Sequence, residues 1–460
     1  MGWIERVGAS IAAGSTLEIP DVYQHNEELL SDEDLEIVSI DVPGDGISLE
    51  TEITVGIDKD FETLSDAISY LENKYFVNGL VIKIDPGLYS GTHTINLFQG
   101  KSLTVECSEP GELDGFGYPQ GSNLNGFFKT ANSGEGVIGL ANAGNDITVT
   151  CATTNPDFSA AGIVPGNKIA VLDASGTIHV LELTGVAGNV LTFGVAAPNV
   201  AGVDSAIGIC PKVELDDDIK FFNIKNLTVS GIFTYSLNNR VFDFNTINKL
   251  SCEKCGSVRF IFAIDSIKSE SKLSQSFSFA AGINGAFSVT TSYYFMFFNC
   301  VGYGFTAFAC RENILVVLAF CTAISSGNSG VFFDFCKGNV TYCSIRAGSY
   351  GVYAERAYLS GANSVIERAT IGVVLEAGSV MDNLWIVNTV KNCPTGYYIN
   401  KSIAALNAGN IIDTSTLVGV KAENASIVED YFASTVFIST PTPFSPAVKG
   451  VQGNNNSMIV

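Results

Sequence analysis

The sequence predicts an all-β solenoid of the parallel β-helix type. The first observation is a motif that recurs every 21 to 26 residues: a Gly, alternating apolar side chains, then usually a carboxylate. Its copies are GFTAF from Gly304, GVFFD from Gly330, GVYAE from Gly351, GVVLE from Gly372, GYYIN from Gly396 and GVKAE from Gly419. The second observation is that each repeat contains short β-branched or aromatic runs and no helical stripe. Such a period is typical of a solenoid, in which one repeat cannot bury its apolar face alone.

The cysteines give the third observation. Cys300, Cys321 and Cys343 are 21 and 22 residues apart, and Cys310 and Cys336 each lie six residues after the Gly of a repeat. Because parallel strands stack about 4.8 Å apart, we expect two columns of thiols that act as small apolar fillers inside the coil.

Eleven cysteines is an odd number, and their columnar spacing is unlike a disulfide framework. We therefore expect reduced thiols and assembly in a cytoplasm. Cys252 and Cys255 form a lone CxxC with no second pair or nearby His, so we expect no metal site and no cofactor.

Residues 1–56 are interpreted as an acidic attachment or connector region. The first 60 residues hold 15 acids against Arg6 and Lys59, in a chain whose net charge is −22. The segment is either a solvated connector or a region that meets a partner. No basic patch exists to displace counterions, so nucleic-acid binding is not expected. No apolar run reaches the roughly 18 residues of a membrane span, and no signal peptide is evident, so neither membrane insertion nor export is expected.

Residues 57–129 are expected to hold a capping helix and the first coils. Phe61, Leu64, Ile68 and Leu71 have the spacing of one helix face, and Asp60 is placed to cap the first turn. A buried strand from Val81 to Ile84 follows. A helix at this point would cover the open end of a β-helix and prevent other chains from stacking on it.

This stretch resembles the start of pectin-lyase-like right-handed parallel β-helices, in particular phage tailspikes and tail fibres. A T-L-x-x-A-I helix core and a P-G-x-Y turn are matched by Thr63, Leu64, Ala67, Ile68, Pro86, Gly87 and Tyr89. The resemblance implies a homotrimer in a virion tail, assembled in the host cytoplasm. It also implies contact with other tail or baseplate proteins through the N-terminal region and binding to host cell-surface polysaccharide. The same fold hosts lyases, hydrolases and inert fibres, so it does not fix the activity.

The rest of the chain divides into three parts. Residues 130–212 interrupt the repeats and read as hairpins, which predicts an inserted small β module. Residues 213–430 are expected to form the β-helix shaft. Residues 431–460 contain Pro441, Pro443 and Pro446 and a Gly- and Asn-rich tail, so we expect them to end the coils. By the resemblance, this last segment would hold three chains together.

The candidate site residues lie in two columns of the shaft. Position four after the repeat Gly places Asp334, Glu355 and Glu376 on consecutive coils, at a spacing that suits a glycosidase carboxylate pair. Arg346, Arg368 and Lys391 lie four or five residues before the Gly and form a candidate glycan-binding column. Three interpretations stay open: mutual neutralisation as surface ion pairs, a groove for an anionic glycan, and catalysis.

The predicted function is host recognition by a phage tail subunit that binds surface glycans. The alternative is a polysaccharide depolymerase, a hydrolase or lyase, that uses Asp334, Glu355 or Glu376. A third possibility is a bacterial secreted lyase or adhesin. The three histidines, His25, His93 and His179, are scattered along the chain, so a Ser-His-Asp site is not expected.

Overall fold

The structure of the protein is a computed structural model. The structure describes residues 16–21, 36–41 and 47–459, except 73, 110–128, 131–136, 152–154, 156, 161, 201–204, 236–240, 259–260, 281–284, 407–408, 414–416, 425, 431–434, 443 and 446–457. Most of the acidic N-terminal region and the Gly- and Asn-rich tail therefore lie outside the described residues.

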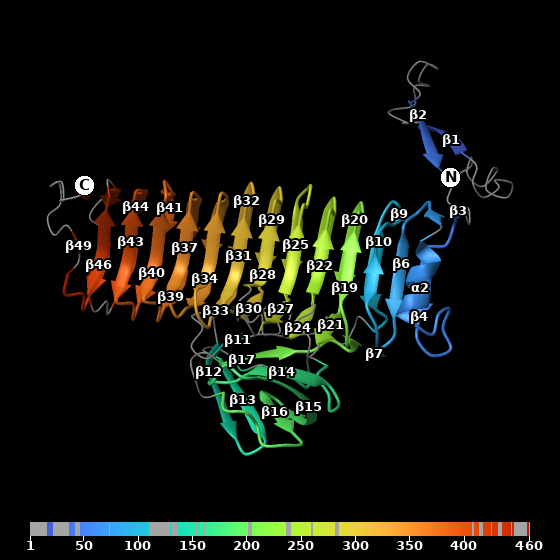
Figure 1. The fold of residues 1–460 in the computed structure, drawn as a ribbon. Coiled ribbons are helices and arrows are strands. Elements are labelled where there is room, and N and C mark those ends of the chain that lie inside the picture. Colours follow the sequence, from blue (N-terminus) through green and yellow to red (C-terminus); the bar gives the residue numbers. More distant parts are fainter. Residues whose placement is uncertain are drawn as a thin grey trace.

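The chain folds as a right-handed parallel β-helix, which confirms the predicted fold class (Figure 1). Each coil contributes one strand to each of three long parallel sheets, which we call sheets 1, 2 and 3. A coil runs from a strand of sheet 1 through sheet 2 to sheet 3, and the chain then enters the next coil in sheet 1. Equivalent residues of successive coils thus lie in register.

Sheet 1 has 14 strands, which in spatial order are β4 (Glu52–Val55), β6 (Leu80–Ile84), β10 (Leu103–Cys107), β20 (Asn226–Ser230), β23 (Lys249–Glu253), β26 (Ser271–Ser274), β29 (Tyr294–Phe298), β32 (Leu315–Ala319), β35 (Lys337–Thr341), β38 (Tyr358–Ala362), β41 (Val380–Ile386), β44 (Ile403–Leu406), β47 (Ile427–Asp430) and β50 (Met458–Ile459).

Sheet 2 has 12 strands: β7 (Gly87–Tyr89), β18 (Val213–Leu215), β21 (Ile232–Tyr235), β24 (Gly256–Val258), β27 (Phe277–Phe279), β30 (Val301–Gly304), β33 (Thr322–Ser325), β36 (Ser344–Arg346), β39 (Val365–Glu367), β42 (Thr389–Lys391), β45 (Ile411–Asp413) and β48 (Val436–Ile438).

Sheet 3 also has 12 strands: β8 (His93–Ile95), β19 (Ile219–Phe222), β22 (Val241–Asn245), β25 (Ile261–Asp265), β28 (Gly285–Thr290), β31 (Thr306–Arg311), β34 (Ser329–Asp334), β37 (Tyr350–Glu355), β40 (Ile371–Glu376), β43 (Thr395–Asn400), β46 (Val418–Glu423) and β49 (Phe444–Ser445).

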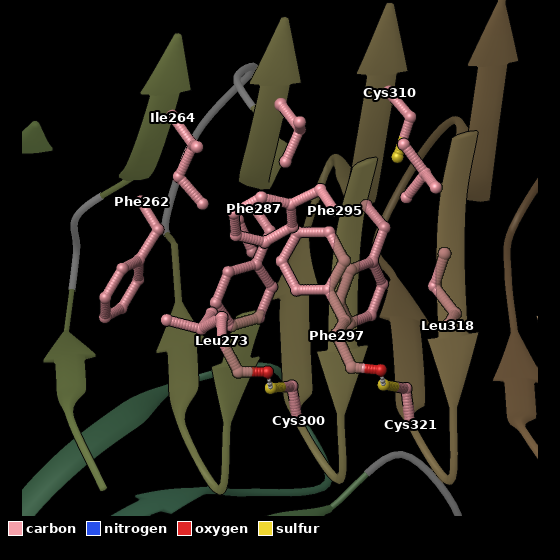
Figure 2. Packing of buried hydrophobic residues seen from close by; sticks show 14 of the residues in the cluster. Phe262, Ile264, Leu273, Phe287, Phe295, Phe297, Cys300, Cys310, Leu318 and Cys321 are labelled. Atoms are coloured by element: carbon pink, nitrogen blue, oxygen red, sulfur yellow. Dashed lines mark hydrogen bonds between the residues drawn. The ribbon is translucent and has the colours of Figure 1, made fainter. Parts of the chain in front are cut away.

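The interior of the coils is filled by stacked aromatic and aliphatic side chains (Figure 2). Phe262, Phe287 and Phe308 occupy one register position on consecutive strands, with ring centroids 5.3 and 4.9 Å apart. Phe297 packs edge-on against Phe308 at 5.2 Å. Offset and edge-to-face contacts of this kind stabilise aromatic cores beyond simple burial. The alternating apolar residues of each repeat therefore supply the core.

The first predicted thiol column is present, between sheets 1 and 2. Its members occupy equivalent corners of successive coils: Cys255, Ser276, Cys300, Cys321, Cys343, Ser364, Asn388 and Asn410. The thiols do more than fill space, because the Sγ atoms of Cys300 and Cys321 donate to the Leu273 and Phe297 carbonyls, both at 3.4 Å (Figure 2). Ten of the described cysteines, all except Cys151, are buried and form no disulfide.

The second predicted thiol column is wrong. Cys310 lies within β31 in register with Phe333, whereas Cys336 lies in the corner after β34. The error arose at Gly304, which ends β30 and is not equivalent to Gly330. Phe308 pairs with Val331, so Ala307 is the residue in register with Gly330. The first copy of the motif was therefore shifted by three residues.

The predicted capping helix is α2 (Leu64–Leu71), which packs its buried face against the first coil. Its N-cap is Thr63 and not Asp60, because the Thr63 side chain accepts from the Asp66 N–H at 3.1 Å. Asp60 instead accepts from the backbone N–H and the hydroxyl of Thr54, both at 2.8 Å. β4 already pairs with β6, so sheet 1 begins before the helix.

Strands near the N-terminus form two further small sheets. β3 (Ile47–Ser48), β5 (Tyr75–Phe76) and β9 (Gln99–Gly100) form a three-stranded parallel sheet. β1 (Thr16–Asp21) and β2 (Glu36–Asp41), from the acidic region, pair antiparallel.

The insertion forms a seven-stranded antiparallel sheet between β10 and β18. In spatial order its strands are β11 (Lys129–Thr130), β17 (Ala206–Ile209), β14 (Lys168–Leu172), β15 (Ile178–Ala187), β16 (Val190–Phe193), β13 (Asp146–Cys151) and β12 (Val137–Ala143). It lies along one side of the shaft (Figure 1). Its core is continuous with buried side chains of sheet 2, among them Phe277, Phe279 and Ile324. The two parts therefore share one apolar cluster.

The last segment of the chain continues the coils, which corrects the expectation that it would end them. β48, β49 and β50 add one further strand to sheets 2, 3 and 1. Pro441 falls between β48 and β49, where its missing N–H removes no ladder hydrogen bond. Prolines at corners are therefore compatible with this coil.

Candidate functional site

The predicted acidic column lies on the outer face of sheet 3. Asp334, Glu355 and Glu376 end the strands β34, β37 and β40 and are paired in register. Their side chains point outward because the preceding residues, such as Ala354, are buried inside the coil. Glu423 ends β46 at the equivalent position and pairs in register with Asn400. The column therefore has the register that the spacing from the repeat Gly predicts.

Aromatic side chains run beside the acids on the same face. Phe332, Tyr353 and Tyr398 occupy one register column, with Val374 between the two tyrosines. The rings of Phe332 and Tyr350 each lie 5.3 Å from the ring of Tyr353. All four aromatic side chains are half-buried, so part of each ring faces solvent. We call this surface, with the acidic column, the aromatic–acidic face.

Tyrosine hydroxyls hold two of the carboxylates. Tyr353 donates to Glu376 at 2.9 Å, and Tyr398 donates to Glu423 at 3.0 Å. Burial raises the pKa of Tyr398 to about 12, with a further contribution from the Glu423 hydrogen bond and charge. Burial and the Glu376 hydrogen bond likewise raise the pKa of Tyr353. Both hydroxyls therefore remain protonated donors at neutral pH.

Arg356 is the cation that contacts the other two acids. Its Nη2 lies 2.8 Å from Asp334 and 3.3 Å from Glu355, and its guanidinium stacks 4.0 Å from the centroid of the Phe335 ring. Arg356 occupies the left-handed corner position after β37, with φ of 50°. Arg356 was not predicted from the sequence, although its place directly after the column residue Glu355 was a usable signal.

The predicted basic column is only partly correct. Arg346 and Lys391 are in one register column of sheet 2, but the residue between them is Glu367 and not Arg368. Arg346 Nε donates to Glu367 Oε1 at 2.6 Å, and Lys391 Nζ lies 3.1 Å from Oε2. Arg368 follows at the corner, with φ of 63°, and is exposed. Counting back from the Gly missed the register by one residue on that coil.

The two columns also differ in how far their side chains are buried. Arg346 and Glu367 have 2% and 6% of their side chains exposed, so they form a buried ion pair. Burial raises the pKa of Glu367, but the charges and hydrogen bonds of Arg346 and Lys391 lower it by more, and the resulting pKa lies below its ordinary value of 4.5. The acidic and basic columns thus lie on different sheets: Arg356 pairs with Asp334 and Glu355, whereas Glu367 pairs with Arg346 and Lys391.

Within the described part of the chain, no group of three or more His, Cys, Asp or Glu side chains is placed to hold a metal ion. Cys252 and Cys255 are both buried in the core, and burial raises the pKa of Cys252 well above its usual range. Nor do the described residues include a helix long and apolar enough to cross a membrane.

Comparison with known proteins gives matches only at the level of structure. No family model and no curated protein matches the sequence. The tailspike gp49 of Pseudomonas phage LKA1 matches with 12% identity over 86% of this chain and 67% of the other, with a TM-score of 0.25. The gp54 tailspike of Acinetobacter baumannii bacteriophage AP22, solved with capsular saccharide, matches with 9% identity over 86% and 76% and a TM-score of 0.24.

A third match is XylC in complex with xylose, with 8% identity over 84% of this chain and 76% of the other and a TM-score of 0.27. At these identities and TM-scores, the matches concern the β-helix and carry no argument about ligand or activity.

Proposed function

We propose that the chain is a host-recognition subunit of a phage tail and that its aromatic–acidic face binds a surface glycan. The observation that carries the proposal is the juxtaposition of partly exposed rings with outward carboxylates on adjacent strands. The face extends over consecutive coils, so a long polymer could contact several of them at once.

The chemistry of the face matches that of a sugar. An exposed ring offers an apolar surface to the C–H face of a pyranose, and Tyr adds a polar edge. Carboxylates accept hydrogen bonds from hydroxyl groups, and Glu355 and Glu376 present theirs in register. Each such contact is weak, but three copies in a trimer would raise the effective concentration and strengthen attachment. Tail partners at the N-terminal region and a virion location belong to the same proposal.

An array of bacterial capsular and lipopolysaccharide glycans tests this proposal. We expect the intact chain to bind at least one polysaccharide and the double variant Tyr353→Ala, Tyr398→Ala to bind it at least tenfold more weakly. The control is Tyr293→Ala, because Tyr293 is 55% exposed and lies outside the face. Unchanged binding by the double variant would reject the proposed surface.

Glycan cleavage is the second candidate function. Glu355 and Glu376 are paired on adjacent strands, whose spacing of about 4.8 Å is close to the roughly 5–5.5 Å between the carboxyls of retaining glycosidases. Arg356 forms ion pairs with Asp334 and Glu355. Glu376 instead accepts hydrogen bonds from the Tyr353 hydroxyl and, at 3.4 Å, from the Asn400 side-chain amide. Glu376 is therefore the acid of the column best placed to exchange a proton with a substrate.

The test of cleavage uses the polysaccharide found by the array. If the chain cleaves it, Glu355→Gln and Glu376→Gln should each abolish product formation while binding changes little. Product formation at the unmodified rate by both variants would remove these residues from the catalytic proposal.

A further inference from the structure

A pocket of about 400 Å³ lies in the crease between the insertion and sheet 2. The turn from Ala174 to Gly176 forms its insertion side, and Ser326, Arg346 and Arg368 line its shaft side. The Tyr303 hydroxyl donates to the Gly176 carbonyl at 3.3 Å and so fixes the turn on the shaft. The pocket volume is at the lower end of the roughly 300–1,000 Å³ of ligand sites.

The unusual feature of this pocket is the guanidinium of Arg346. Only its Nε has a partner, Glu367, while Nη1 and Nη2 are buried and have no hydrogen-bond partner among the described residues. These two nitrogens carry four N–H donors in a planar arrangement. Burying unpaired donors of a charged group is costly, so the pocket favours an acceptor that supplies the missing hydrogen bonds.

The charge around the pocket favours an anion. The carboxylate of Glu367 is shared between Arg346 and Lys391, and Arg368 adds a further positive charge to the wall. Asp173 precedes the insertion turn, but its oxygens accept from Ser175, Thr177 and His179 within the insertion. Arg346 and Arg368 thus bring two positive charges to the pocket wall, and the carboxylate that contacts Arg346 is itself shared with Lys391.

We propose that this pocket binds the carboxylate of an acidic sugar, with Arg346 and Arg368 as its donors. A carboxylate is planar and matches the geometry of a guanidinium, with which it forms paired, charge-assisted hydrogen bonds. The choice of a sugar as the carrier of the carboxylate rests on the proposed glycan-binding function. The oxyanion site itself rests only on the unpartnered Arg346 nitrogens and the local charge.

Calorimetric titration of the intact chain with glucuronate, glucose and inorganic phosphate tests the inference. We expect glucuronate to bind and glucose to bind at least tenfold more weakly. Arg368→Ala should weaken glucuronate binding at least tenfold, and this variant should fold because Arg368 is exposed and lies outside the buried ion pair. Lys272→Ala is the control, since Lys272 is an exposed cation on β26 of sheet 1, outside both the pocket and the aromatic–acidic face.

Arg346→Lys provides a second variant, which keeps the charge beside Glu367 but removes the planar Nη pair. Its glucuronate affinity should fall while its melting temperature shows that it is folded. Absence of glucuronate binding at tens of millimolar, or unchanged binding by Arg368→Ala, would overturn the inference. Tighter binding of phosphate than of glucuronate would replace the sugar acid with phosphate. Because the array test uses Tyr353 and Tyr398, failure there and failure here are distinguishable.

Discussion

At the scale of single residues, the register of a parallel sheet decides which charges meet. Arg346, Glu367 and Lys391 come from three coils, yet strand pairing places them in one column with opposite charges adjacent. The central carboxylate is 6% exposed and has a cation on each side. Desolvation of these charges is costly, so the ion pair is stable only while all its members are present.

Replacing Glu367 with Gln should therefore destabilise the chain. The change leaves Arg346 buried without its counter-charge, which typically costs about 3–5 kcal/mol. Chemical denaturation monitored by circular dichroism measures the effect. Glu355→Gln is the control, because Glu355 is a half-exposed acid of the outer face, and it should cost less than about 1 kcal/mol.

The same residue predicts a pH dependence. The pKa of Glu367 is lower in the folded chain than its ordinary value of 4.5. Its stabilising contribution is thus fully present above pH 4.5 and is lost as the pH falls through the lower folded pKa. Between wild type and Glu367→Gln, the difference in unfolding free energy should shrink in that acidic range. A difference that is constant with pH would contradict this assignment.

At the scale of elements, the repeat Gly is a packing requirement of the coil. Gly351 is the second residue of β37 and has no left-handed φ. A Cβ there would overlap Ile366 Cγ2 of sheet 2 and the carbonyl oxygen of Gly372 on the next coil. The Gly therefore lies within a strand and lets the β-branched side chains of sheet 2 approach sheet 3 closely.

Gly351→Ala should destabilise the shaft by about 1–3 kcal/mol, the usual cost of overpacking a filled core. Thermal unfolding gives the measurement. Gly348→Ala is the matched control, because Gly348 lies in the corner just before β37. A Cβ at Gly348 would have its nearest neighbour, the Gly327 carbonyl oxygen, at 3.4 Å, which is an ordinary contact. If both variants unfold like the wild type, the close approach at Gly351 does not limit packing.

The thiol column makes a second prediction for the elements. Ten cysteines are buried, and those of the column donate to carbonyls of the preceding coil. Burial raises the pKa of Cys321 and Cys310 well above the usual range, which suppresses the reactive thiolate. At most one thiol of the native chain should react with a water-soluble disulfide reagent at neutral pH, and eleven should react after denaturation. Rapid reaction of several native thiols would contradict the buried column.

The parts of the fold that the sequence could predict are those with a strict period. The coil length, the Cys300–Cys321–Cys343 column and the acids of sheet 3 all follow from spacing, because parallel strands keep equivalent residues in register. Arg368 was misplaced because the count back from the Gly is one residue shorter on its coil, and Cys310 because Gly304 is not equivalent to the repeat Gly. The partners Arg356 and Glu367, and the strands of the last coil, depend on three-dimensional contacts or on turns that show no periodicity.

At the scale of the whole molecule, we propose that the tail subunit assembles as a homotrimer. Light scattering after size exclusion should give three times the chain mass of 48.7 kDa, about 146 kDa. The chain has no cysteine pairing among its described residues, so a reducing agent should leave this mass unchanged. A mass near 48.7 kDa would contradict the trimer and favour a single-chain polysaccharide enzyme.

The most direct test of the glycan-binding account is the position of a bound oligosaccharide in a crystal structure of the intact chain. The oligosaccharide should be a fragment of the polysaccharide that the array identifies. The account predicts sugar rings over Tyr353 and Tyr398, with hydroxyl groups within hydrogen-bond distance of Glu355 or Glu376. An oligosaccharide bound on another surface, with the outer face of sheet 3 empty, would contradict it.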